Sequence, residues 1–241
     1  MNRPARSLLS LALLALAASA GATGLALPFS GLAPGTPPEK WIHTTLPKVA
    51  RASVFDLVDD GGSTVLRIRS DAAASSLSQA LSVDPGATPL LKWRWKVSSP
   101  VKGSDLGSKH GDDYAARLYV FFDLPAERLS LADRLAIAAA RMVHGAELPT
   151  AALCYVWGTA QPIGTIAPNP YTDRLRMVVL ESGDRLAGRW MVEARDVAAD
   201  FATAFGEPAP IVTGIAIGAD TDNTGAAVTV RFGDISFGTR P

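Results

Sequence analysis

The sequence predicts an all-β protein, an antiparallel jelly-roll β-sandwich into which one amphipathic helix is inserted. Short segments of alternating or apolar residues recur along the chain, turn residues separate them, and one long segment has helical periodicity. We expect strands at ten segments: 53–58, 64–69, 77–83, 90–97, 115–123, 152–158, 174–180, 189–195, 211–218 and 227–237.

The turn residues between these segments have the spacing of hairpin loops. "DDGGS" at 59–63 joins the first two strands, and "DPGATP" at 84–89 and "ESGDRLAG" at 181–188 interrupt the pattern in the same way. Glycine, aspartate and proline favour tight turns, so most strands should pair with their sequence neighbours.

The inserted helix is expected over 130–144. Ser130 is suited to cap its start, Gly145 follows its end, and four residues share one stripe at helical spacing: Leu131, Leu135, Ala138 and Met142. "DVAADFATAFG" at 196–206 predicts a second short helix.

The N-terminus predicts export. Residues 1–20 carry Arg3 and Arg6, then an apolar run, then Ala18-Ser19-Ala20, the order of a secretory signal peptide that is cleaved near Ala20. The run is shorter than the roughly 20 apolar residues of a permanent anchor. We therefore expect a periplasmic or secreted protein with a Gly/Pro-rich arm at 21–40 and one β-sandwich domain at 41–241.

Charge and cysteine content narrow the class of protein. Of the 23 basic and 23 acidic residues, cleavage would remove two arginines and leave a formal charge of −2. This balance gives no electrostatic basis for binding nucleic acid or an anionic membrane. Cys154 is the only cysteine, so no internal disulfide can form, and its apolar neighbours predict a buried free thiol.

Alternation along each strand assigns residues to two faces. The first set is apolar and should form the core: Trp93, Trp95, Leu118, Val120, Phe122, Cys154, Val156, Leu175, Met177, Val179, Trp190 and Val192. The second set is rich in arginine and aromatic residues, which suit sugar rings and hydroxyl or carboxylate groups. It predicts a ligand-binding face of Arg117, Tyr119, Tyr155, Trp157, Arg176, Glu193 and Arg195, with Asp113 beside Arg117. Cross-strand ion pairs on a solvated face are the alternative interpretation.

Candidate metal ligands and catalytic groups occur in loops. "DTDNTG" at 220–225 places Asp220, Asp222 and Thr224 at alternate positions, as in the first half of a calcium loop, but Arg231 stands where the bidentate glutamate would be. Weak calcium binding or a strand-linking turn both fit this loop, and no other cofactor is expected. Asp112 and Asp113 stand before a strand, and Asp113 with Glu193 is the best available carboxylate pair. No complete catalytic motif is present.

Several stretches together resemble an exported bacterial family, the domain of unknown function family 3047. They are "KWRWKV", "GDDYAARLYVFFD", "CYVWG", "NPYTDRLRMVVLESG", "FGEPAPIVTGIAIGADTDNTG" and "FGDISF", and they extend from about Trp41 to Phe237. The resemblance implies an exported jelly-roll β-sandwich and no particular activity. The closing strand is also similar to the last strand of carbohydrate-binding jelly rolls, an analogy of fold alone.

These observations favour an exported protein that binds a saccharide or another polar envelope ligand without catalysis. A polysaccharide-cleaving hydrolase or lyase on the same fold is the first alternative, and a structural protein that docks to a partner is the second.

Overall fold

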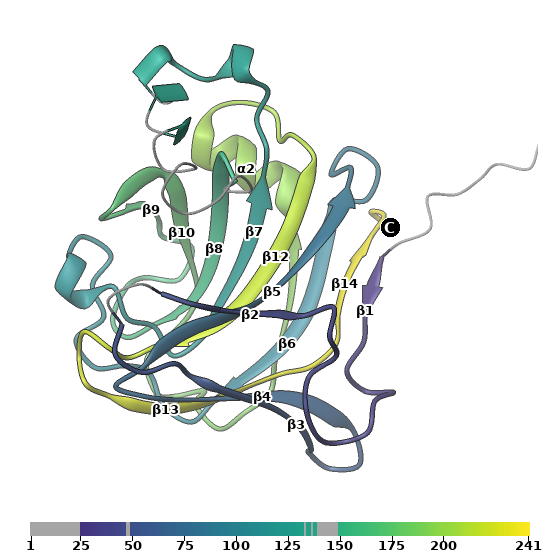
Figure 1. The fold of residues 1–241 in the computed structure, drawn as a ribbon, viewed down its shortest axis with the longest axis vertical. Coiled ribbons are helices and arrows are strands. Elements are labelled where there is room, and N and C mark those ends of the chain that lie inside the picture. Colours follow the sequence, from purple (N-terminus) through teal and green to yellow (C-terminus); the bar gives the residue numbers. More distant parts are fainter. Residues whose placement is uncertain (1–24, 47–48, 133, 136, 139–148) are drawn as a thin grey trace, which may run out of the picture.

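The computed structural model describes residues 25–46, 49–132, 134–135, 137–138 and 149–241. In these residues two seven-stranded sheets enclose one large core (Figure 1). The predicted β-sandwich is confirmed. Both sheets contribute to the same core. The predicted signal peptide, residues 1–20, lies outside the described residues.

The first sheet contains strands from both ends of the chain. Its order is β1 (Ala26–Leu27), β14 (Ile235–Gly238), β6 (Leu90–Val97), β13 (Ala227–Phe232), β4 (Thr64–Asp71) and β3 (Val54–Asp59), and β11 (Met191–Asp196) pairs with the other side of β6. All its pairings are antiparallel. The expected strand 227–237 is divided at Gly233 and Asp234 into β13 and β14.

The second sheet carries the candidate site. Its order is β2 (Ile42–Thr45), β5 (Ala74–Val83), β12 (Val212–Asp220), β7 (Arg117–Phe122), β8 (Ala151–Gly158), β10 (Thr172–Ser182) and β9 (Ile166–Asn169). β8 and β10 are parallel and the other pairs are antiparallel. All ten expected strands are present, whereas β1, β2 and β9 were not predicted because they are short.

The expected pairing of most strands with their sequence neighbours is wrong. The loop at 59–63 joins the paired strands β3 and β4, but the loops at 84–89 and 181–188 lead from one sheet to the other, from β5 to β6 and from β10 to β11.

The core between the sheets is built around large aromatic side chains. Trp93 on β6 lies 5.3 Å from Tyr155 on β8 between ring centroids, and Trp95 lies 6.2 Å from Trp157. Phe232 on β13 packs on Trp95 at 6.0 Å. Each of these rings removes a large apolar area from water, so they stabilise the packing of the two sheets.

A second, smaller cluster lies on the outer face of the second sheet, the side turned away from the first sheet. It contains Leu106, Tyr114, Cys154, Val156, Met177 and Val179. Residues 101–116 and β9 supply its cover. Cys154 is fully buried and free, as predicted, and burial raises the pKa of its thiol, which keeps it protonated.

The expected division of faces is correct for β6 and β7 but wrong for three strands. On β8 and β10, Tyr155, Trp157 and Val178 face the main core, whereas Cys154, Val156, Leu175, Met177 and Val179 belong to the outer cluster. All eight residues of β8 are buried, so polarity does not distinguish its two faces.

The apolar residues expected to face the core in the segment of β11 face outward instead. Trp190, just before the strand, donates to Asp60 and lies beside Arg94 and Lys96. Val192 is 77% exposed, while Met191 packs against the core and Glu193 accepts a hydrogen bond from Trp95 Nε1 at 3.0 Å. The buried indole N–H needs an acceptor, which explains why a carboxylate rather than an apolar residue points inward.

One of the two predicted helices is confirmed. The helix expected over 196–206 is α2 (Val197–Phe205): Asp196 caps it by accepting from Ala199 N at 3.0 Å, and Gly206 ends it in the left-handed conformation. The helix expected over 130–144 lies largely outside the described residues. The residues described between 131 and 138 are helical, and Leu131 and Leu135 on the expected apolar stripe are 73% and 64% exposed.

The expected arm at 21–40 is instead part of the sandwich where it is described. β1 pairs with β14, and Leu27 and Phe29 are buried in the main core. Asp234 fixes this segment by accepting hydrogen bonds from the backbone of Phe29 and Ser30 at 2.7 and 2.9 Å.

The assignment of β11 can be tested by replacing a valine with alanine at a buried position and at an exposed position. Val230→Ala on β13 should lower the free energy of unfolding by about 2 kcal/mol because Val230 is fully buried. Val192→Ala should change it by less than about 0.5 kcal/mol. Urea denaturation measures both. Similar losses at the two sites would contradict the assignment of β11.

Candidate functional site

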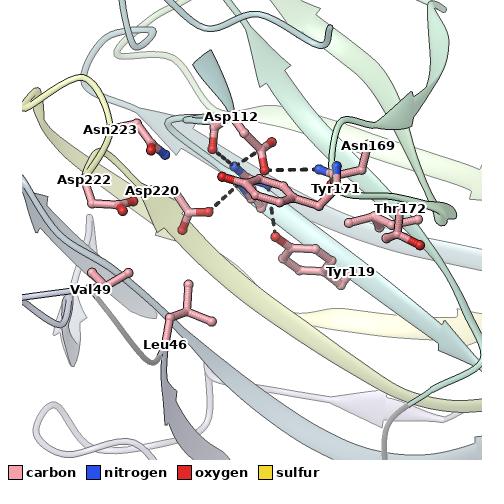
Figure 2. Close-up of a pocket in the computed structure, with 12 residues that line it drawn as sticks. Leu46, Val49, Asp112, Tyr119, Asn169, Tyr171, Thr172, Asp220, Asp222 and Asn223 are labelled. Atoms are coloured by element: carbon pink, nitrogen blue, oxygen red, sulfur yellow. Dashed lines mark hydrogen bonds and ion pairs between the residues drawn. The ribbon is translucent and has the colours of Figure 1, made fainter. Parts of the chain in front are cut away.

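A pocket of about 600 Å³ opens on the outer face of the second sheet (Figure 2). Polar groups on its lining come from the turn before β7, from β7 itself and from the end of β12, and further residues come from β9–β10 and the segment after β2. The lining residues are Leu46, Val49, Asp112, Arg117, Tyr119, Asn169, Tyr171, Thr172, Leu175, Asp220, Asp222 and Asn223. In Figure 2, Asp222 and Asn223 lie on one side of the pocket, and Asn169, Tyr171 and Thr172 on the other.

The buried guanidinium group of Arg117 forms the floor of this pocket. Its side chain is 2% exposed, and its Nε lies 2.9 Å from Asp220 Oδ2. Its Nη2 donates to the carbonyl of Asp112 and lies 3.2 Å from Asp112 Oδ1, and its Nη1 donates to the Tyr119 hydroxyl at 3.1 Å. The ring of Tyr114 lies 4.8 Å away. Although burial alone would lower it, the pKa of Arg117 is raised by these neighbours, so the charge is permanent.

Asp113 has a structural role directly behind the pocket. It is fully buried, and its carboxylate accepts from Asn223 Nδ2 at 2.9 Å and from both the backbone N and the Oγ1 of Thr224 at 2.7 Å. Thr221 is also fully buried, where its hydroxyl lies 2.9 Å from Ser70 Oγ. The loop at 220–225 is therefore held as a tight turn that presents Asp222 and Asn223 to the pocket.

The oxygen atoms predicted to bind calcium have different partners. Asp220 pairs with Arg117, and the hydroxyl of Thr224 donates to Asp113. In the described part of the chain, no three histidine, cysteine or acidic side chains are grouped so that they could hold a metal ion. The turn interpretation fits this geometry, and calcium binding by the loop stays a prediction.

Two carboxyl groups of the pocket, those of Asp220 and Asp222, have raised pKa values. Burial raises the pKa of Asp220 from its ordinary value to about 7; Arg117 opposes the shift, and Asp112, Asp113 and Asp222 add to it. Burial and the charge of Asp113 also raise the pKa of Asp222. Near neutral pH, the carboxyl group of Asp220 can therefore donate or accept a proton.

The structure separates the predicted ligand-binding face into two groups. Arg117 and Tyr119 line the outer pocket, and Asp113 lies behind it. The other five lie on the opposite side of the second sheet, between the sheets: Tyr155, Trp157, Arg176, Glu193 and Arg195. The common face predicted from the alternation is therefore wrong.

The inner group is occupied by its own contacts. The hydroxyl of Tyr155 donates to Asp200 Oδ2 at 2.8 Å, and Arg195 forms a two-point ion pair with the same carboxylate. Trp157 Nε1 donates to the carbonyl of Gly183 at 3.0 Å. Arg176 lies over the ring of Phe205 at 5.4 Å. These contacts stabilise the closed edge of the sandwich beside α2.

The proposed acid–base pair of Asp113 and Glu193 is also not formed. Asp113 lies beneath the 220–225 turn, whereas Glu193 contacts Trp95 between the sheets, where burial and nearby Glu181 raise its pKa. A common substrate cannot reach both carboxylates.

Sequence reasoning missed the far wall of the pocket. Asn169 donates to Asp112 Oδ2 at 3.1 Å across 57 residues of sequence, and Tyr171 is 60% exposed at the rim. Both lie in the "NPYT" segment, whose turn composition was the only local signal.

The pKa of Asp220 makes a prediction about stability. Because the folded state holds this proton to a higher pH than the unfolded chain, Asp220 binds more protons in the folded state between about pH 4 and 7, and its contribution to stability falls as pH rises through this range. Asp220→Asn mimics the protonated acid, so its stability relative to the wild type should increase from pH 4 to pH 8. Thermal unfolding across this range measures the difference. Asp173→Asn, an exposed carboxylate, controls for net charge, and a difference that is constant with pH would refute the prediction.

Comparisons with known structures give distant similarities. The adhesin domain K2 of Lys-gingipain is 12% identical with a TM-score of 0.39 over 89% of this chain and 99% of that chain. An engineered Cel12A cellulase from Rhodothermus marinus is 13% identical with a TM-score of 0.40 over 90% and 99%. The Endo-D glycoside hydrolase domain from Streptococcus pneumoniae R6 is 10% identical with a TM-score of 0.33 over 82% and 21%.

Comparison with curated proteins gives no match. None of the helices in the described ranges has the length and hydrophobicity needed to span a membrane. Residues 39–236, which include both sheets from β2 to β14 and every residue of the pocket, match the family described as "Protein of unknown function (DUF3047)". The chain belongs to this family.

Proposed function

We propose that this protein is exported, with cleavage of its signal peptide near Ala20, and binds a neutral saccharide in the pocket above Arg117. The observation that carries the proposal is the combination of fixed polar groups and an exposed aromatic ring around one cavity of about 600 Å³. Such a cavity can hold a small number of sugar units.

The charge of the pocket favours a neutral ligand. Among the lining residues that the structure describes, Asp112, Asp220 and Asp222 supply three carboxyl groups and Arg117 supplies one cation. Two guanidinium nitrogens of Arg117 donate to Asp112 and Tyr119, and its Nε lies 2.9 Å from Asp220 Oδ2, so neighbouring groups of the chain already neutralise its charge. A ligand carboxylate would therefore be repelled, whereas sugar hydroxyls can donate to the carboxylates.

The walls of the pocket supply the complementary contacts. Asn223 and Asn169 donate through Nδ2 to Asp113 and Asp112, which orients both side chains. Their amide oxygens can accept hydrogen bonds from sugar hydroxyls. Tyr171 presents its ring at the rim, where the amine of Lys109 lies 5.0 Å from the ring centroid and holds one face. Its other face is suited to stack on the apolar side of a pyranose ring.

Two substitutions at opposite walls test this function. Tyr171→Ala and Asp222→Asn should each weaken binding of neutral gluco-, xylo-, manno- or galacto-oligosaccharides about tenfold, because each removes a contact worth about 1.4 kcal/mol. A glycan array identifies the ligand and calorimetry measures the affinities. Ile163→Ala, which truncates an exposed apolar side chain outside the pocket lining, is the control. Wild-type protein that binds no neutral oligosaccharide would refute the proposal.

A saccharide-cleaving activity is the second candidate, favoured by the three carboxyl groups around one pocket. Glycoside hydrolysis needs one protonated and one ionised carboxyl group, and the raised pKa of Asp220 fits the acid. Asp220→Asn and Asp222→Asn should then abolish release of reducing ends, whereas Tyr171→Ala should mainly raise KM. Binding without product release by the wild type would identify the protein as a binder alone.

A further inference from the structure

The outer face of the first sheet carries a row of like charges. Lys96 on β6 is directly opposite Arg231 on β13, and Arg231 is directly opposite Arg67 on β4. Their alternate neighbours face the core, so these three side chains point away from it. Like charges directly opposite each other destabilise a sheet. This row of like charges therefore lowers the stability of the first sheet, and the fold does not need it.

Two carboxylates neutralise the row only in part. Asp56 on β3 forms a two-point ion pair with Arg67 and lies 3.7 Å from Arg69. Asp60 lies 2.6 Å from Lys96 Nζ and 3.9 Å from Arg231 Nε. Arg231 Nε is buried and has no hydrogen-bond acceptor in the described structure.

The ring of Trp190 links a fifth cation, Arg94, to the row. The guanidinium carbon of Arg94 lies 4.5 Å from its ring centroid and Lys96 Nζ lies 4.8 Å away, and the indole N–H donates to Asp60 at 2.9 Å. The ring thus holds both cations at the surface. The five cations of this basic row are Arg67, Arg69, Arg94, Lys96 and Arg231. Three carboxylates lie near them: Asp56, Asp60 and, beside Arg94, Asp234.

The charged groups of the row are accessible. The side chains of Lys96, Arg231, Arg67 and Arg69 are 18%, 30%, 26% and 51% exposed. Because the first sheet separates this row from the pocket on the second sheet, the two sites can act independently. The row has more cations than neighbouring carboxylates, which favours an anionic ligand.

The geometry of the row favours an acidic polysaccharide. Neighbouring strands are about 4.8 Å apart, close to the length of one pyranose unit, so cations on successive strands can meet carboxylates on successive sugars. Guanidinium groups can bind carboxylates at two points. Arg67 and Lys96 already pair with Asp56 and Asp60, so Arg231, whose Nε has no hydrogen-bond acceptor in the described structure, is the cation of the row best suited to bind a ligand carboxylate. We propose that the outer face of the first sheet binds a polysaccharide of acidic sugars along the row Lys96, Arg231 and Arg67.

Two other anionic partners fit this face less well. Single-stranded nucleic acid needs free aromatic rings for base stacking, and the ring of Trp190 contacts two cations. A membrane surface needs apolar side chains that enter the lipid, and the large exposed apolar residues on the outer face of this sheet are Val54 and Val192, on its two edge strands.

Affinity electrophoresis in polygalacturonate tests the proposal, with its methyl-esterified form as the uncharged comparison. Wild-type protein should be retarded by the acidic polymer alone, and the retardation should decrease with salt. Arg231→Gln should weaken binding about two- to fivefold and should not lower the melting temperature, because it relieves the repulsion within the row. Lys102→Gln removes one exposed charge outside the row and should bind like the wild type.

The panel should also contain alginate, chondroitin sulfate, anionic phospholipid vesicles and single-stranded DNA. Binding of an acidic polysaccharide that Arg231→Gln weakens and Asp222→Asn leaves unchanged supports the proposal. Equal binding of the esterified polymer, equal loss in Lys102→Gln, binding of vesicles or DNA alone, or no binding of any acidic polysaccharide would each overturn it. Failure here leaves the pocket proposal untouched, because that rests on neutral sugars and on Tyr171 and Asp222.

Discussion

The buried charge of Arg117 is the constraint on which the candidate site depends. A guanidinium group that is 2% exposed must be paired, because an unpaired buried charge costs several kcal/mol. Its partners, Asp112 and Asp220, come from the turn before β7 and from the end of β12, which are far apart in sequence. Satisfying one cation therefore brings two chain segments to one place and points two carboxylates at the same cavity.

The surrounding loops are organised by the same principle. Asp113, next to Asp112, is fully buried and must find donors, which it takes from Asn223 and Thr224. The turn at 220–225 is thereby fixed against the 109–113 turn. Burial of acidic groups near one another also raises the pKa of Asp220 and Asp222. The same buried acidic groups therefore fix the loops and raise the pKa values of the pocket carboxyl groups Asp220 and Asp222.

Local sequence patterns predicted the strands, the hairpin of β3 and β4, and α2, because turn residues and caps act over a few positions. They failed at the faces of β8 and β11 for different reasons. β8 is buried on both sides by loops that cross the second sheet, so its alternation has no polar contrast. β11 is an edge strand whose inward Glu193 is needed by the indole of Trp95, a contact across 98 residues.

Part of the candidate site could also be predicted from the sequence. Arg117, Tyr119 and the acidic turn were identified because their residue types are unusual beside a strand. Asn169 and Tyr171 were not, because only the pairing of β9 with β10 brings their turn to the pocket. The two sheets also differ in charge: the pocket on the second is acidic, while the outer face of the first carries the basic row.

The central claim is that the groups around Arg117 recognise a neutral sugar. The most direct measurement is a crystal structure of the protein soaked with a mixture of neutral oligosaccharides. We expect a sugar ring against Tyr171, with hydroxyl groups donating to Asp222 and Asp112 and the ion pairs of Arg117 intact. A sugar bound elsewhere with this pocket empty, or a ligand carboxylate bound directly to Arg117, would contradict the claim.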